Sequence, residues 1–394
     1  MNILMISDVY FPRVNGVSTS IQTFRCELQA LGHNCTLIAP DYPAPYPDEA
    51  DIRRIASRAV IFDPEDRMMK ASELRRLARG LVPGSYDIVH IQTPFVAHYL
   101  GVKMARQMGI ACVETYHTFF EEYLYHYIPV VPRAWLKSLA RRFARAHGHD
   151  VDELIVPSAA MRDRLLEYGV TTSMRVLPTG IPAPDLFTID GPAFRRKHKI
   201  APERPVLLFV GRVAFEKNIE FLIDSVALAA RRIPDLLLIV AGEGPALSRL
   251  KRTVEERKLS DHVMFIGYLD RSRELPSCYA AADVFVFASR TETQGLVLLE
   301  AMSIGLPVIS LAVMGTRDIL DLGRGALIPR DDERDFAAHI IRLVGNQELR
   351  QRLAREAREY ACEWQSGVIA GKLISLYEQV VNRRSETAAE THPA

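Results

Sequence analysis

The sequence is poor in cysteine and has no excess of charge of either sign. Only 5 of its 394 residues are cysteines, scattered and odd in number, and no CxxC or Cys/His cluster occurs. This pattern argues against a disulfide framework or a zinc site and is typical of a reducing compartment. The 49 basic and 48 acidic residues give a formal net charge of +1, so no overall charge attracts nucleic acid or acidic partners.

Long apolar runs are also missing. No uncharged stretch approaches the roughly 20 residues that span a bilayer. The opening residues MNILMISDVYF carry no basic region and reach Asp8 early. We therefore expect a cytoplasmic protein without a secretory signal or a transmembrane helix. Peripheral attachment to the inner face of the cell membrane is compatible with these absences.

What the chain does contain is an alternation of short apolar runs and longer amphipathic stretches. Five runs in the first half are predicted strands: 2–7, 35–40, 86–91, 111–116 and 153–157. Five more follow in the second half: 205–211, 236–242, 262–267, 283–289 and 307–310. Continuous apolar strands separated by helices predict parallel sheets covered on both faces. The fold class is therefore α/β, with two Rossmann-like doubly wound domains.

The stretch 177–194 separates the two series, because it holds four prolines and two glycines. The predicted organisation is a first domain at 1–178, a linker at 179–204, a second domain at 205–362, a C-terminal helix at 363–382 that packs back on the first domain, and a disordered tail at 383–394. Ligands of such sheets bind at the carboxyl ends of the strands, so a cleft between the domains is the expected active site.

Two cations follow the first strand of the second domain. Arg212 and Lys217 lie in GRVAFEKN, directly after the strand 205–211. Arginine offers a planar fork to phosphate oxygens, and lysine offers a mobile point charge. Either residue alone is more often a solvated surface cation. As a pair at the end of a parallel strand, they make phosphate binding an equal alternative.

The next strand is followed by AGEGP, at 241–245, which contains a GxG element. The third glycine of GxGxxG is missing, since the chain continues Pro245-Ala246-Leu247. A dinucleotide site is therefore only weakly indicated. A tight strand-to-helix turn explains the two glycines at least as well.

A glycine is predicted to open the helix after the strand 283–289. Gly295 precedes the apolar stretch LVLLEAMSI, which ends at Gly305. The free N–H groups near Gly295, Leu296 and Val297 would favour an anion, and a residue without a side chain would let a phosphate approach the backbone.

Two glutamates flank this predicted anion site. Glu292 precedes the turn, and Glu300 lies inside the apolar helix. A carboxylate in such a helix costs free energy unless it has a partner. Sugar hydroxyls could be that partner, since a carboxylate accepts two hydrogen bonds at once. The alternative is an ion pair between Glu300 and a nearby arginine.

Together these motifs resemble the GT-B glycosyltransferases of family 4 over nearly the whole chain. GR…EKN, AGEGP and ETQGLVLLE carry the likeness in the second half, and DVYFPRVNGVSTSIQTF, YHTFFEEYLYHYIP and PTGI carry it in the first. The resemblance implies two domains facing a central cleft, a helical C-terminal end, and sugar transfer from a nucleotide sugar with retention of anomeric configuration. It also implies that no metal is essential, and the sequence has no convincing DxD donor motif.

The resemblance further assigns roles to matching residues. Those expected at the donor diphosphate are Gly16, Arg212, Lys217, Gly295, Leu296 and Val297. Glu300 would hold the nucleotide ribose, and Gly267 with Tyr268 would face the base. His117 and Glu292 would lie beside the transferred sugar as the catalytic residues. On physical grounds alone, a single histidine such as His117 is more often structural.

The forms TETQGL and HTFFEEYLYHYI resemble enzymes that glycosylate membrane glycerolipids. The preferred prediction is glucose transfer from UDP-glucose to diacylglycerol. One alternative is a GDP-mannose-dependent mannosyltransferase that acts on a lipid or a glycan. A different class, a non-catalytic protein that binds nucleotide sugars or membranes, fits less well with the retained charged residues. Glu121, Glu122 and His126 are weaker candidates for acceptor contacts.

A basic amphipathic helix is predicted at 132–149. Its cations are Arg133, Lys137, Arg141, Arg142 and Arg145, and most of them fall opposite the apolar stripe Trp135, Leu139 and Phe143. Such a helix, with Trp135 as an anchor, can lie on an anionic membrane. The ordinary alternative is that the apolar stripe packs on the sheet. A second basic stretch lies at 67–80, and no nucleic-acid reader motif occurs.

Overall fold

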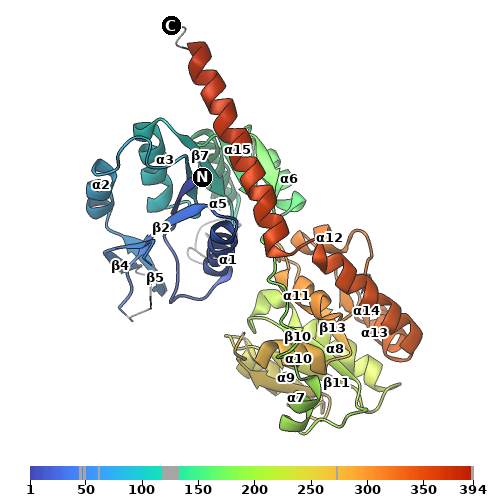
Figure 1. Ribbon diagram of the computed structural model, residues 1–394. Coiled ribbons are helices and arrows are strands. Elements are labelled where there is room, and N and C mark those ends of the chain that lie inside the picture. Colours follow the sequence, from blue (N-terminus) through green and yellow to red (C-terminus); the bar gives the residue numbers. More distant parts are fainter. Residues whose placement is uncertain (44–46, 48–49, 61–62, 118–132, 272–273, 392–394) are drawn as a thin grey trace. The chain divides into compact units, whose positions relative to one another are not determined.

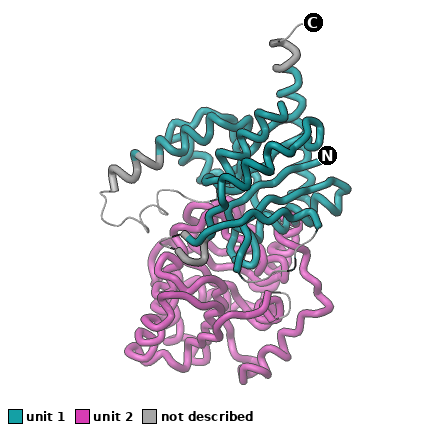
Figure 2. The backbone as a smooth tube through the Cα atoms, turned by 90° about the vertical axis from the view of Figure 1, so that its left-hand side faces the viewer, with its two compact units in different colours: residues 1–180, 366–394 teal, residues 181–365 magenta. Residues whose placement is uncertain are grey.

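The computed structural model describes residues 1–43, 47, 50–60, 63–117, 133–271 and 274–391 (Figure 1). The chain divides into two compact units, shown in separate colours in Figure 2. Unit 1 holds Met1–Gly180 together with Ser366–Ala394, and unit 2 holds Ile181–Gln365. Each unit contains a parallel sheet with helices packed on it, which confirms the predicted α/β fold class.

The sheet of unit 1 has seven strands, in the order β3-β2-β1-β6-β7-β8-β9, and every neighbouring pair is parallel. The strands are β1 (Asn2–Ile6), β2 (Asn34–Pro40), β3 (Ile52–Ile55), β6 (Ile88–Ile91), β7 (Ala111–Thr115), β8 (Glu153–Val156) and β9 (Met174–Val176). The two edge strands β3 and β9 were not predicted, because IRRI and MRV have little of the apolar character of a buried strand. An antiparallel hairpin joins β4 (Ser57–Val60) to β5 (Asp63–Met69).

Helices cover both faces of this sheet. The helices of unit 1 are α1 (Gly16–Ala30), α2 (Ala71–Arg79), α3 (Val96–Met108), α5 (Arg133–His149), α6 (Ala159–Glu167) and α15 (Ser366–Thr391). Helices α1 and α15 share one buried core with alternate residues of the central strands, among them Ile3, Met5 and Ile88. Helix α3 packs on the opposite face, where Gly101 lies against Ile6 and Ile91.

The C-terminal helix is longer than predicted. Helix α15 runs from Ser366 to Thr391, so residues 383–391 are helical where the sequence predicted a disordered tail. Two ion pairs explain why the helix continues, since they hold Arg383 and Arg384 of α15 against the start of β8. Arg383 Nη2 lies 2.7 Å from Glu153 Oε2, and Arg384 Nη1 lies 2.8 Å from Asp152 Oδ2.

The predicted linker also contains regular structure. Helix α7 (Gly191–Lys197) lies within 179–204, and residues from Ile181 onward belong to unit 2. Arg195 holds α7 in place: its Nε donates to the Ala281 carbonyl at 2.7 Å, and its Nη2 lies 3.0 Å from Asp283 Oδ2. The proline-rich composition concealed this short helix, which Asp190 caps through the Ala193 N–H.

The sheet of unit 2 has six parallel strands, in the order β12-β11-β10-β13-β14-β15. Its strands are β10 (Val206–Val210), β11 (Leu237–Ala241), β12 (Val263–Gly267), β13 (Val284–Phe287), β14 (Val308–Ser310) and β15 (Ala326–Leu327). Its further helices are the 3₁₀ turn η1 (Phe215–Lys217), α8 (Ile219–Ala230), α9 (Leu247–Glu256), α10 (Glu274–Ala281), α11 (Leu296–Ile304), α12 (Gly315–Leu320), α13 (Glu333–Val344) and α14 (Gln347–Cys362). The strand order reverses at β10 and β13, which makes their carboxyl ends the topological switch point.

Candidate active site

The switch point of unit 2 brings the predicted phosphate-binding residues onto neighbouring loops. Strand β10 leads to Arg212 and Lys217, and the adjacent strand β13 leads to Glu292 and Gly295. A hydrogen bond from Asn218 Nδ2 to the Ala288 carbonyl, at 3.2 Å, joins the two loops. The order of the strands therefore brings Lys217 and Glu292 together at one edge of the sheet, although they lie 75 positions apart in the sequence.

Lys217 and Glu292 form an ion pair at this edge. Lys217 Nζ lies 2.6 Å from Glu292 Oε2, and each side chain is 20% exposed. Lys217 Nζ also lies 6.0 Å from the centroid of the Phe287 ring, on the last residue of β13. The pair is therefore partly desolvated yet reachable by a ligand, which strengthens its interaction with any phosphate or hydroxyl that arrives.

Arg212 is exposed, and among the described residues its side chain has no hydrogen bond or ion pair. It follows Gly211 directly, at the end of β10. A cation held at a strand end without a protein partner keeps all its guanidinium donors for a ligand.

The N-terminus of α11 has the form that the sequence predicted. Gly295 is its N-cap, with φ 88° in the left-handed region, and no side chain caps the first turn. Helix α12 fixes the preceding loop, because the Gly315 N–H donates to the Glu292 carbonyl at 2.9 Å. A Cβ at Gly315 would lie 2.0 Å from the Thr293 oxygen, so only glycine fits there. The first-turn amides near Leu296 and Val297 are thereby left to an anion or to water.

Glu300 has protein partners on both carboxylate oxygens. Its Oε1 pairs with Arg271, and its Oε2 accepts a hydrogen bond from the Tyr279 hydroxyl at 2.9 Å. The arginine pair is the alternative that the sequence left open. Burial raises the pKa of Tyr279 well above its usual value, so the phenol stays protonated and keeps donating. The Glu300 side chain is 16% exposed, and the more exposed Arg271 is the partner that a ligand could replace.

The glycines of AGEGP serve backbone packing. A Cβ at Gly242 would lie 2.0 Å from the Gly211 oxygen, and one at Gly244 would lie 2.4 Å from the Val213 oxygen. The Val213 N–H donates to the Glu243 carbonyl at 2.9 Å, and the Gly242 N–H donates to the Gly267 carbonyl at 2.7 Å. The turn explanation of GxG is therefore sufficient, and hydrogen bonds between main-chain atoms join the loops after β10, β11 and β12.

Gly267 and Tyr268 lie at the end of this series of loops. Gly267 has φ 74°, a conformation that favours glycine, and it ends β12. Tyr268, which follows it, is 64% exposed. A large exposed aromatic ring beside a fixed turn is available to stack on a planar group.

The remaining predicted residues, Gly16 and His117, lie in unit 1. Gly16 opens α1, where Asn15 Oδ1 accepts from the Ser18 N–H at 2.8 Å. A Cβ at Gly16 would meet no atom within 4 Å, so protein packing does not require glycine at this position. His117 follows β7, and its Nε2 lies 3.0 Å from Gln92 Oε1. Burial lowers the pKa of His117 to about 4, so the ring is neutral at pH 7.

Unit 1 also contains polar residues that the sequence did not single out. Asp8 follows β1 and caps α3: its Oδ2 accepts from Thr93 Oγ1 at 2.8 Å and from the Ala97 N–H at 3.0 Å. Burial raises the pKa of Asp8 to about 6. Gln92 follows β6 just as His117 follows β7. A polar residue directly after a buried strand was the signal that could have identified both Asp8 and Gln92.

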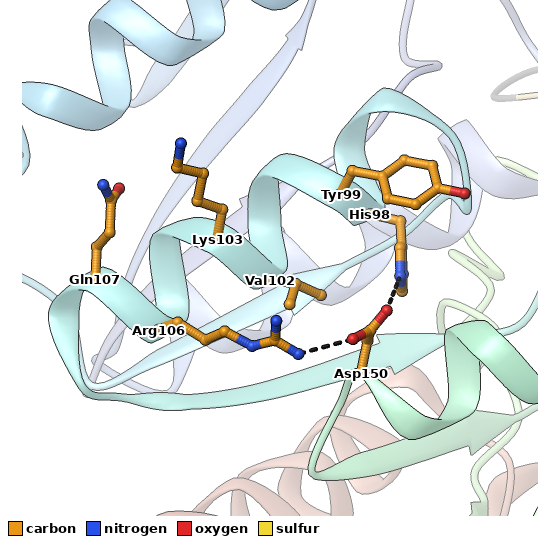
Figure 3. Close-up of a pocket in the computed structure, with 7 residues that line it drawn as sticks. All are labelled: His98, Tyr99, Val102, Lys103, Arg106, Gln107 and Asp150. Carbon is orange, nitrogen blue, oxygen red and sulfur yellow. Dashed lines mark hydrogen bonds and ion pairs between the residues drawn. The ribbon is translucent and has the colours of Figure 1, made fainter.

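A surface hollow of about 430 Å³ lies elsewhere in unit 1, along α3 (Figure 3). Arg106 Nη2 crosses it to Asp150 Oδ1 at 2.7 Å, and His98 Nε2 lies 3.6 Å from Asp150 Oδ2. His98 Nδ1 meets the buried Glu114 at 2.9 Å. None of the predicted site residues lines this hollow, and its charged groups are largely paired with one another.

The predicted basic helix is α5, and three of its arginines are described. Arg141, Arg142 and Arg145 are exposed, and the Arg141 guanidinium lies 5.7 Å from the Tyr168 ring. The side chains of Arg133, Trp135 and Lys137, and all of 118–132 with Glu121, Glu122 and His126, lie outside the described residues. No helix among the residues described is long and apolar enough to cross a bilayer.

Comparison with known families matches both halves of the chain. Residues 14–183 match Glycosyltransferase Family 4, and residues 190–360 match Glycosyl transferases group 1. An alpha-monoglucosyldiacylglycerol synthase of Streptococcus pneumoniae is 34% identical over 79% of this chain and 71% of that protein. A GDP-mannose-dependent alpha-mannosyltransferase of Mycobacterium tuberculosis is 29% identical over 99% of each chain.

Solved structures share the fold. A sucrose-phosphate synthase from Thermosynechococcus elongatus, 22% identical, superposes with a TM-score of 0.77 and covers 97% of this chain and 100% of its own. HepE of Anabaena, solved in complex with UDP, gives 0.74 at 16% identity over 96% of this chain and 100% of its own. The chain therefore belongs to the GT-B glycosyltransferases of family 4, close to the glycolipid glucosyltransferases among them.

Proposed function

We propose that this glycosyltransferase moves glucose from UDP-glucose to a hydroxyl of diacylglycerol with retention, at the inner face of the cell membrane. The observation that carries the proposal is the edge of unit 2. There the Lys217–Glu292 pair and the uncapped start of α11 lie near Arg212, which has no side-chain partner in the described part of the chain. The glucosyldiacylglycerol synthase that is 34% identical supports the choice of sugar and acceptor.

The donor would bind with its diphosphate between these groups. Arg212 and Lys217 would neutralise phosphate oxygens, and the amides at Gly295, Leu296 and Val297 would donate to them. Charge grows on the diphosphate as the bond to the sugar breaks, so donors fixed in advance at that place lower the barrier. With these cations and amides in place we propose no essential metal.

The nucleoside would occupy the neighbouring loops. Ribose hydroxyls would replace Arg271 on Glu300, while Tyr279 keeps that carboxylate oriented. The uracil would lie beside Gly267 and stack on the exposed Tyr268. This order, from base to sugar along the edge, follows the order of the strands from β12 to β13.

The transferred sugar would meet Glu292 and His117. The Glu292 carboxylate would accept hydrogen bonds from sugar hydroxyls, and the neutral ring of His117 would form a hydrogen bond with a further sugar hydroxyl. Gly16 would leave room for the diphosphate at the start of α1. We assign no protein nucleophile to the reaction.

The acceptor would be reached at a membrane. The exposed arginines of α5 (Arg141, Arg142 and Arg145) supply a positive surface for anionic lipids. We include Arg133, Trp135 and Lys137 in this membrane contact because they share the helix. Anionic liposomes should pellet the protein and neutral ones should not. Equal pelleting after charge reversal at the three arginines would contradict this membrane contact.

A second candidate is mannose transfer from GDP-mannose to a lipid or a glycan. The mannosyltransferase that is 29% identical over 99% of this chain favours it. Both candidates use the same phosphate-binding groups and differ at the base and the sugar.

A panel of UDP- and GDP-sugars with liposomes of defined lipids tests the proposal. We expect a glucosyl-diacylglycerol with the α-anomer, identified by product mass and anomeric analysis. Arg212→Ala should lower the rate about a hundredfold, while Arg231→Ala, which removes another exposed arginine at the far end of α8, should not. A mannolipid product from GDP-mannose would select the second candidate, and no transfer from any donor would refute both.

A further inference from the structure

Gln92 contacts His117, the histidine that the proposed reaction needs in a fixed orientation. Gln92 is the first residue after β6, and its backbone N–H donates to the Ile6 carbonyl at 2.9 Å, so the sheet fixes its position. Its side chain belongs to a residue only 1% exposed. His117 follows the neighbouring strand β7, which pairs in parallel with β6. The two side chains therefore leave the same edge of the sheet from adjacent strands.

The contact between them is directional. Gln92 Oε1 lies 3.0 Å from His117 Nε2. A carbonyl oxygen only accepts hydrogen bonds, so Nε2 of His117 must carry the hydrogen. A neutral imidazole carries one hydrogen, so Nδ1 is left with a free lone pair. The ring is thus a hydrogen-bond acceptor at Nδ1, the nitrogen that Gln92 does not bind.

The amide nitrogen of Gln92 is the second polar atom of this side chain. Among the described residues, no group hydrogen-bonds its Nε2, although the atom is buried. A buried donor left unpaired costs about 1–3 kcal/mol, so a purely structural glutamine here would be a poor choice for stability. A leucine of similar size would cost less. The buried amide therefore indicates a task other than holding the core together.

Among the residues that the structure describes, the charged and titratable neighbours do not supply an alternative partner for His117. His90, on β6, faces the same side, but its Nδ1 meets the Tyr377 hydroxyl at 2.5 Å and its Nε2 meets Thr115 Oγ1 at 2.7 Å. Burial and the neighbouring His117 lower the pKa of His90 to about 3, so it is neutral too. Gln92 is then the group among the described residues that orients the His117 ring.

We propose that Gln92 is a positioning residue, which fixes the His117 ring and its Nε2–H tautomer so that Nδ1 accepts a hydrogen bond from a substrate hydroxyl. The role in turnover rests on the proposed function. The tautomer itself does not, because it follows from the contact in the free protein. The two parts can therefore fail separately.

The full-length protein labelled with ¹⁵N in histidine gives the decisive measurement. At pH 7 we expect His117 as the Nε2–H tautomer in the unaltered protein and a mixture in Gln92→Leu. Gln92→Glu should keep the tautomer and raise the pKa of His117, because a carboxylate favours the protonated ring. Thr93→Val is the matched control, since Thr93 is the next residue but bonds Asp8 instead. It should leave the His117 signals unchanged.

Activity then tests the second part. With a donor and acceptor that the unaltered enzyme uses, Gln92→Leu should lower kcat about tenfold with little change in KM. Gln92→Glu should restore much of kcat above the new pKa of His117, so that the acid limb of the pH profile moves upward. If Gln92→Leu does not fold, Gln92→Asn, which withdraws the amide by one methylene, replaces it.

Two results would overturn the inference. One is an Nδ1–H tautomer in the unaltered protein, which would mean that the Gln92 amide is turned the other way. The other is identical His117 signals and an identical pH profile in every Gln92 variant. If no donor is turned over, the proposed function fails while the tautomer measurement still decides the role of Gln92.

Discussion

The carboxyl edges of the two sheets are built in different ways. In unit 2, main-chain hydrogen bonds join the loops after β10, β11 and β12, and Gly242, Gly244 and Gly315 pack where no side chain fits. In unit 1, main-chain hydrogen bonds such as that from the Gln92 N–H to the Ile6 carbonyl also extend past the strands, and buried side chains add contacts between the loops, as in Asp8 with Thr93. A Cβ at Gly16, by contrast, would meet no atom within 4 Å.

This difference separates two ways to make a binding edge. Backbone contacts keep their shape whatever ligand is bound, which suits a site that must offer fixed amides and cations to a diphosphate. Side-chain pairs between neighbouring strands depend on the protonation of buried groups such as Asp8 and His90. The edge of unit 1 should therefore respond to pH, and the edge of unit 2 should respond to changes of its backbone.

The largest effect should follow removal of a cation from the edge of unit 2. Lys217→Ala should lower kcat/KM about 10²- to 10³-fold, because it removes a charge aimed at the leaving diphosphate. Steady-state kinetics with the donor that the panel of nucleotide sugars identifies would measure this. Lys251→Ala removes an exposed lysine of α9 and should leave the kinetics unchanged. Equal behaviour of the two variants would mean that Lys217 serves its pair with Glu292 and not the reaction.

A methyl group added to the backbone-built edge should cost the most stability. In Gly315→Ala the Cβ would lie 2.0 Å from the Thr293 oxygen, so the loop must move, at a cost of about 3 kcal/mol. Hydrogen exchange of α11 and α12 amides and urea unfolding would measure the loss. Gly371→Ala, in α15, meets no atom within 4 Å and should be neutral or stabilising. Matching losses in both variants would show that the close approach at Gly315 is not real.

The pH dependence of stability should distinguish unit 1. The pKa of His90 is lowered to about 3 and that of His117 to about 4. As the pH falls below about 6.5, the unfolded chain takes up protons that the folded state refuses, so unit 1 loses stability. Asp8 acts in the opposite direction, because its raised pKa of about 6 means that the folded state is protonated first. Its buried charge destabilises the fold at pH 7.

Asp8→Asn tests this balance. The variant keeps an oxygen to accept from Thr93 and Ala97 and loses the buried charge, so it should be about 1–3 kcal/mol more stable at pH 7. Near pH 4 the gain should vanish, which makes the acid loss steeper than in the unaltered protein. Urea unfolding at both pH values, monitored by hydrogen exchange of β1 and α3 amides, gives the change of unfolding free energy with pH for each protein. Parallel slopes would refute the raised pKa of Asp8.

The smallest effect concerns Gly16, where an added Cβ would meet no atom within 4 Å. Gly16→Ala should leave the unfolding free energy unchanged or slightly higher, since the space around its Cβ is open within 4 Å. Under the proposed function it should lower kcat/KM about tenfold, or by about 1.4 kcal/mol, because the methyl would meet the diphosphate. Full activity would place the donor away from α1.

Much of the fold could be predicted because strands buried on both faces leave continuous apolar runs. Residues 205–211 and 283–289, for example, contain β10 and β13 within two residues at each end. Gly295 and Gly305 marked both ends of α11. The edge strands β3 and β9 were missed because they have little apolar character, and the helical end of α15 was missed because tertiary pairs such as Arg383 with Glu153 stabilise it.

The sequence by itself determined the α/β architecture, the family and the candidate residues at strand ends, since these depend on local periodicity and on short motifs. Only the tertiary structure decided the partners: Lys217 with Glu292, Glu300 with Arg271 and Tyr279, and His117 with Gln92. The physical reason is that strand order, which no local pattern encodes, brings distant residues to one edge of a sheet. Burial then determines which of those residues carry charge.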